Sequence, residues 1–80
     1  SYTYQILNGR RKPTRNFLLR IAIFIGLSLD ETQKMLTIAQ RPQLYPRNRF
    51  DAAIIFSLEH KMSLDETYEL LEEIGEEPLN

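Results

Sequence analysis

Cysteine is absent from the 80-residue chain, and long apolar runs are absent as well. Without cysteine, the chain can form neither a disulfide nor a thiolate metal site, and it has no cysteine nucleophile. This absence is typical of proteins in a reducing compartment, so we expect a cytoplasmic location. The longest apolar runs, such as residues 21–25, are far too short to span a bilayer, and no signal-peptide pattern is present. We therefore expect no membrane partner.

Groups suited to catalysis are also scarce. The only histidine, His60, is predicted at the C-terminal end of a helix, where a positive charge interacts favourably with the helix dipole. This position explains His60 without a role in metal binding or proton transfer. The acidic pairs Asp30/Glu31 and Asp65/Glu66 are explained by helix capping. The chain has no glycine-rich phosphate loop and no serine–histidine arrangement. These absences predict a protein that is not an enzyme and that holds no cofactor or metal.

The composition fits one small packed domain with an uneven charge distribution. A chain of this size buries about 60% of its unfolded surface, and 42% of its residues are apolar, which is enough for a core. The net charge is −1, but residues 1–20 contain five cations and no acid, whereas residues 61–80 contain one lysine and seven acids. A basic end is expected to meet a polyanion. The acidic end is expected to be a solvated helix face, with a basic protein partner as the alternative.

Glycine, proline and capping residues divide the chain into five predicted helices. Thr14 is the expected N-cap of the second helix, and Gly9 and Gly26 are expected to end the first and second helices. No segment alternates with period two over a useful length, so no sheet is expected. The fold class is therefore all-α, a small five-helix bundle. The predicted helices span residues 1–8, 15–25, 29–40, 64–75 and a segment that starts between 46 and 48 and ends near 59.

An internal repeat connects the later helices. The sequence Ser-Leu-Asp-Glu-Thr occurs at residues 28–32 and again at residues 63–67, and each copy predicts a capping box at a helix start. Apolar positions match at the same offset of 35 residues. We therefore expect two similar helical hairpins, one on each side of a linker at residues 40–45. The matched apolar residues are Leu19, Ile21, Leu27 and Leu36 in the first copy, and Ile54, Phe56, Met62 and Leu71 in the second.

The apolar pattern predicts which helices are central. The helix at residues 15–25 is apolar nearly all round after its first turn, and the helix that ends near residue 59 has the same character. We expect these two helices to pack against each other, and any uncovered apolar face to bind further helices or a second subunit. Tyr4 is expected to pack against a neighbouring helix. The last helix is an ordinary amphipathic helix whose apolar stripe contains Leu64, Thr67, Tyr68, Leu71 and Ile74.

The first fourteen residues carry the most specific pattern. Small and polar side chains share a short helix with one apolar anchor, Ile6, and a glycine stop then leads into three cations. Together with residues 18–22 (Leu-Leu-Arg-Ile-Ala) and 26–31 (Gly-Leu-Ser-Leu-Asp-Glu), this stretch resembles the second half of the lambda-repressor-like, XRE-type helix-turn-helix family. The resemblance covers residues 1 to about 38. The stretch Leu-Tyr-Pro-Arg-Asn-Arg at residues 44–49 resembles an extension found in one branch of that family.

The resemblance implies a sequence-specific transcriptional regulator that binds double-stranded DNA. Residues 1–39 would be the C-terminal part of the helix-turn-helix domain, and residues 46–80 a helical hairpin packed on it. The recognition helix would present Ser1, Tyr2, Thr3 and Gln5 to base edges, and Gln5 is the best candidate because an amide can bond adenine at two points. The phosphate contacts would come from Asn8, Arg10, Arg11 and Lys12. The alternative for the three cations is a solvated turn.

The sequence departs from this family in two ways. The family's first two helices do not precede residue 1, so half of the usual core around Ile6 is missing, and we expect a homodimer formed through an exposed apolar face. Ile23 stands where the family has an exposed lysine, so we expect the C-terminal hairpin to cover it. The remaining core positions implied by the resemblance are Leu18, Ile21, Ala22 and Leu29. The alternative function is a helical-repeat module for protein–protein interaction or dimerisation, without DNA binding.

Overall fold

The computed structural model describes residues 1–80 and contains five helices and no strand, which confirms the all-α prediction. Each predicted helix is present, with its ends shifted by less than one helical turn. None of the five has the length and apolar character that crossing a membrane needs. In chain order the helices are α1 (Tyr2–Leu7), α2 (Arg15–Ile25), α3 (Leu29–Ile38), α4 (Arg49–Glu59) and α5 (Leu64–Glu73).

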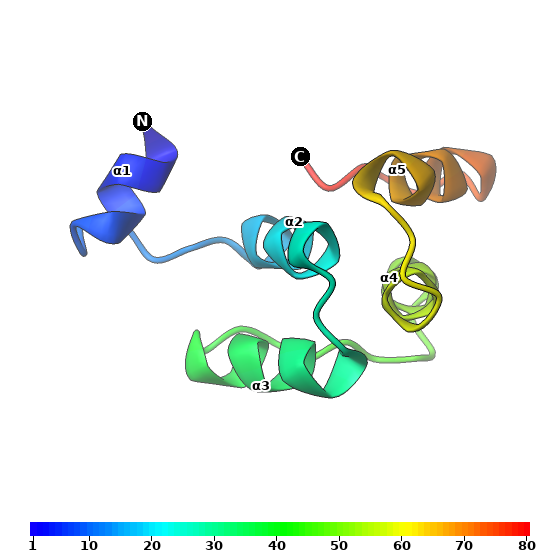
Figure 1. The fold of residues 1–80 in the computed structure, drawn as a ribbon, viewed down its shortest axis with the longest axis horizontal. Helices are drawn as coiled ribbons and strands as arrows, with labels where there is room; N and C mark the ends of the chain where they lie inside the picture. Colours follow the sequence, from blue (N-terminus) through cyan, green and yellow to red (C-terminus); the bar gives the residue numbers. More distant parts are fainter.

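Helix α1 stands apart from the other four helices (Figure 1). Its backbone does not closely approach any other helix, and it contains no buried residue. The expectations that Ile6 lies in the core and that Tyr4 packs against a neighbour are therefore wrong: Ile6 is half-buried and outside the core, and Tyr4 is 55% exposed. The reason is that α1 meets the body through its first turn, where the ring of Tyr2 packs edge-on against Phe17 with 5.1 Å between ring centroids.

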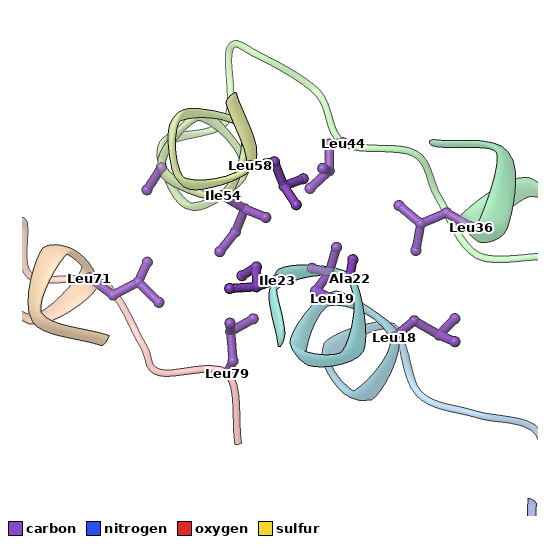
Figure 2. Close-up of a cluster of buried hydrophobic side chains, with 11 residues drawn as sticks. Leu18, Leu19, Ala22, Ile23, Leu36, Leu44, Ile54, Leu58, Leu71 and Leu79 are labelled. Atoms are coloured by element: carbon purple, nitrogen blue, oxygen red, sulfur yellow. The ribbon is translucent and has the colours of Figure 1, made fainter. Parts of the chain in front are cut away.

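Helix α2 is the centre of the body and packs against α3, α4 and α5 (Figure 1). The predicted packing of α2 against α4 is confirmed. Leu19 of α2 and Ile54 of α4 are both fully buried. Ile23 is buried beside Ile54 and Leu79 (Figure 2), so the C-terminal part of the chain covers it as expected. The core consists of Leu18, Leu19, Ala22, Ile23, Leu36, Leu44, Ala53, Ile54, Leu58, Leu71 and Leu79.

One core expectation for α2 is wrong. Ile21 is only half-buried and does not belong to the core, whereas Leu18 and Ala22 are buried and Leu29 packs against the core as expected. A helix turns by about 100° per residue, so a single buried stripe cannot include every apolar position of a helix that is apolar nearly all round. The unburied remainder of this helix includes Phe24, which is exposed to solvent.

The sequence repeat is also a structural repeat. Both predicted capping boxes are formed, at Ser28 and at Ser63. Thr32 and Thr67 are fully buried, and each donates a hydrogen bond from its hydroxyl to the carbonyl oxygen four residues earlier, at 2.8 Å in both cases. The same threonine therefore fixes the first turn of α3 and of α5, which explains why the matching stretch extends one residue beyond the capping box.

The repeat extends further than the sequence pattern indicated. Leu44 and Leu79 are separated by the same offset as the capping boxes, and both are buried after the last turn of a hairpin. Gln40 and Gly75, also equivalent, both adopt the left-handed conformation, with φ of 58° and 75°. Each hairpin thus ends in a left-handed turn that leads a leucine back into the shared core. Residues of both predicted domain parts therefore contribute to one core, as does Leu44 in the predicted linker.

An ion pair fixes the segment between the hairpins. Arg15, at the start of α2, forms a two-point contact with the carboxylate of Asp51 in α4, with both N–O distances at 2.9 Å. Arg15 also donates hydrogen bonds to the carbonyl oxygens of Pro42 (2.9 Å) and Gln43 (3.0 Å). Asp51 accepts a third hydrogen bond from the backbone N–H of Tyr45 (2.9 Å). The side chains of Arg15 and Asp51 are 22% and 8% exposed, so this pair is largely shielded from water.

Candidate nucleic-acid interface

The predicted DNA-contacting residues occupy α1 and the turn that follows it. Ser1 is the N-cap of α1, and its hydroxyl accepts a hydrogen bond from the backbone N–H of Tyr4 at 3.3 Å. Thr3 and Gln5 are exposed on the helix surface. Asn8 ends the helix, and its side-chain amide donates to the carbonyl oxygen of Tyr4 at 2.8 Å. The short helix therefore presents polar groups to solvent at its start, middle and end.

Tyr2 is half-buried and contacts the body of the protein. Its ring lies against Phe17, and its phenol oxygen accepts a hydrogen bond from the backbone N–H of Thr14. The guanidinium group of Arg11 lies over the same ring, 5.2 Å from its centroid. Tyr2 was predicted at a base edge, but these contacts make it the residue that attaches α1 to the body.

The surroundings of the Tyr2 phenol are positively charged. Partial desolvation raises the pKa of this phenol, but the hydrogen bond from Thr14 and the nearby charges of Arg11 and Arg41 lower it, and the net pKa lies below the ordinary value for tyrosine. Arg41 comes from the turn after α3, far from Tyr2 in sequence. The effect of both arginines on one phenol shows that they share the same electrostatic environment.

The three cations of the exit turn are exposed and close to α1. Arg11 donates a hydrogen bond to the side-chain oxygen of Gln5 at 3.3 Å, and Lys12 donates to the carbonyl oxygen of Gln40 at 3.2 Å. Arg10 forms no hydrogen bond through its side chain. None of the three pairs with an acid, because the ion pairs of the chain all lie elsewhere. Their charge is therefore available to an anionic ligand.

Arg41 is a member of this basic surface that the sequence pattern did not indicate. Its Nε donates a hydrogen bond to the carbonyl oxygen of Pro13 at 2.9 Å, which places it next to the exit turn. Conversely, Arg15 belongs to the basic end in sequence, but its charge is compensated by Asp51. No local sequence pattern indicates this position of Arg41, because its partner Pro13 lies 28 residues away in the chain. The basic surface thus consists of Arg10, Arg11, Lys12 and Arg41.

This arrangement can bind phosphate groups and can also contact base edges. Guanidinium groups bind phosphate oxygens at two points, and the turn brings two of them to the side of α1. The side-chain oxygen of Gln5 is bonded to Arg11, but its amide N–H groups have no partner and remain available as donors. Phosphate contacts from the turn would set the register of the helix, and base contacts from the helix would supply the sequence preference.

Other kinds of site find little support among the residues of this chain. No group of three histidine, cysteine, aspartate or glutamate side chains lies in a position to hold a metal ion. His60 is exposed at the C-cap of α4, where its ring stacks on Phe56 at 3.9 Å between centroids and its Nδ1 lies 2.9 Å from the Phe56 carbonyl oxygen. No family model matches the chain, and no curated protein or solved structure matches it either. The helix-turn-helix resemblance therefore stays a prediction.

Proposed function

We propose that this chain is the DNA-contacting part of a transcriptional regulator that binds double-stranded DNA. The observation that carries the proposal is the basic surface of Arg10, Arg11, Lys12 and Arg41, which lies beside an exposed polar helix and contains no acidic partner. Side chains of this kind are suited to phosphate oxygens, and a helix beside them is suited to the major groove.

The proposal assigns different roles to the two sides of α1. Ser1, Thr3 and Gln5 contact base edges, and Gln5 does so through its free amide N–H groups. Asn8 lies next to the phosphate-binding turn, although its amide already donates to the end of the helix. Tyr2 has a positioning role, because its contacts with Phe17 and Thr14 fix how α1 projects from the body. The function is binding, not catalysis.

The proposal is tested by titrating a labelled mixed-sequence DNA duplex with the chain at several salt concentrations. Binding through phosphates weakens steeply with salt, with a slope of about 0.9 per phosphate contact in a plot of log K against log salt. The double substitution Arg10→Ala and Arg11→Ala is expected to lower the affinity by at least tenfold and to reduce that slope by about 2.

A matched control separates this surface from general charge attraction. Lys34 and Arg47 are exposed cations outside the basic surface, and Lys34→Ala with Arg47→Ala removes the same charge. This control is expected to retain most of the affinity. Equal losses in both double variants would mean that net charge alone drives binding, and no duplex binding by the native chain would refute the proposal. Selection from a pool of randomised duplexes then measures sequence preference, which Gln5→Ala is expected to relax.

A further inference from the structure

A groove with apolar walls runs between α4 and α5, away from the residues proposed to contact DNA. It has a volume of about 320 Å³. Phe56 is 47% exposed in its wall, and its ring stacks on the ring of His60. The groove is therefore an unpartnered helix–helix face. It is lined by Arg49, Ala52, Ala53 and Phe56 from α4 and by Leu70 and Ile74 from α5.

Acidic side chains border this groove. On α5, Glu69 and Glu73 lie next to Leu70 in the helical order, on the side that faces away from the buried Leu71. On α4, Glu59 lies one turn after Phe56. The three carboxylates are exposed, and none forms an ion pair. The border of the groove thus carries uncompensated negative charge.

The single cation of the groove does not change this balance. Arg49 lies at one end, where its guanidinium group donates a hydrogen bond to the carbonyl oxygen of Ile74 and lies 3.9 Å from the carboxylate of Glu76. Its charge is therefore directed to the end of α5 rather than to the acidic border. A ligand in the groove meets apolar walls in the middle and carboxylates at the sides.

We propose that this groove binds a cationic amphipathic helix of a partner protein. Apolar side chains one turn apart on such a helix fit between Phe56 and Leu70, and lysine or arginine side chains on its flanks meet the carboxylates of the border. The partner is not a second copy of the same face, because two acidic borders repel each other. Nor is it the basic turn of a second copy, because Arg10, Arg11 and Lys12 lie on a turn without an apolar stripe.

The experiment uses the full chain and a fluorescent synthetic helix as the probe. The probe has leucine at alternating three- and four-residue spacing and lysine on both flanks, and a control probe carries glutamate in place of lysine. Saturable binding of the lysine probe only is expected. Phe56→Ala is expected to weaken it about tenfold, and Glu73→Lys several-fold, with the effect of Glu73→Lys diminishing at high salt.

Two control variants match these changes outside the groove. Phe24→Ala removes an exposed phenylalanine from α2, and Asp30→Lys reverses an exposed charge on α3. Both are expected to leave probe binding within twofold of the native value. Circular dichroism of all four variants establishes that each remains folded, which is expected because the replaced side chains lie outside the core.

Three results would overturn the proposal. The first is binding of the lysine probe that Phe56→Ala leaves unchanged, because the attraction would then be a property of the acidic surface and not of the groove. The second is a dimer of the native chain in sedimentation that Phe56→Ala dissociates, because a second copy would then occupy the groove. The third is no binding of the probe. None of these results bears on DNA binding, which depends on the other end of the chain.

Discussion

The buried ion pair between Arg15 and Asp51 predicts that Asp51→Asn destabilises the protein by about 3 kcal/mol. The carboxylate of Asp51 accepts two hydrogen bonds from Arg15 and one from Tyr45, each at 2.9 Å. An asparagine amide replaces one oxygen with a donor, so it cannot accept all three, and it leaves the arginine charge without its partner. Breaking a buried pair in this way costs about 3–5 kcal/mol. The side chain of Arg15 is 22% exposed and regains some water, so we expect the lower value.

This loss is large relative to the whole fold. A chain of 80 residues has a free energy of unfolding of about 4–12 kcal/mol. A loss of about 3 kcal/mol corresponds to a decrease in Tm of roughly 12–24 °C for a domain of this size. Urea unfolding followed by circular dichroism measures the loss directly, and the m-value is expected to stay unchanged because the surface exposed on unfolding is the same.

Asp30→Asn provides the matched control. Asp30 forms an ion pair with Lys34 at 3.7 Å, but their side chains are 87% and 75% exposed, so its removal is expected to cost less than about 1 kcal/mol. In addition, Arg15→Ala with Asp51→Ala is expected to cost less than the sum of the two single changes, because each single change leaves one buried charge alone. Equal effects of Asp51→Asn and Asp30→Asn, or strict additivity in the double variant, would refute this reasoning.

Three further predictions concern the repeat and its caps. Leu79→Ala is expected to lower the free energy of unfolding by about 2–5 kcal/mol in urea, because the side chain of Leu79 is fully buried although the residue is the second-last of the 80. A loss below about 1 kcal/mol would contradict the place of Leu79 in the core. Residues 40 and 75 both adopt the left-handed conformation, which glycine tolerates better than other residues. Gln40→Gly is therefore expected to stabilise the protein by about 1 kcal/mol, and Gly75→Ala to destabilise it by about 1 kcal/mol. The second cost is backbone strain alone, because nothing lies within 4 Å of a Cβ added at Gly75. Hydrogen bonds from the backbone and side chain of Ser28 lower the pKa of Glu31. The contribution of Glu31 to stability is therefore present above the unfolded glutamate pKa of about 4.3 and is lost as the pH falls through the lower folded pKa. Glu31→Gln is expected to reduce this loss in urea titrations between pH 5 and pH 3, and an unchanged pH profile would contradict the prediction.

Local chemistry made the helices predictable from sequence. The capping boxes at Ser28 and Ser63 act between residues three positions apart, so their pattern is visible in the sequence and both are formed. Gly26 ends α2 where it was predicted to, because a left-handed cap favours glycine. The packing of α2 on α4 was also predictable, since a helix that is apolar nearly all round requires cover on several sides.

Contacts between distant segments were not predictable in the same way. Nothing near Arg15 distinguishes it from the other cations of the basic end, and its partner Asp51 lies 36 residues away. The same holds for Arg41, which reaches the exit turn through a contact with Pro13 across 28 residues. Tyr2 was predicted to contact a base edge because its contacts with Phe17 and Thr14, 15 and 12 residues away in the chain, were not visible in the sequence. These two residues hold the ring and the hydroxyl of Tyr2 against the body.

The central claim is that α1 and the adjacent basic surface bind duplex DNA. Nuclear magnetic resonance of the ¹⁵N-labelled chain tests it most directly, with backbone amide shifts followed during titration with a DNA duplex. Shift changes are expected to concentrate in residues 1–14 and around Arg41, whereas α4 and α5 are expected to stay unchanged. Shift changes centred on α4 and α5, or no change at duplex concentrations that saturate an anisotropy titration of the native chain, would contradict it.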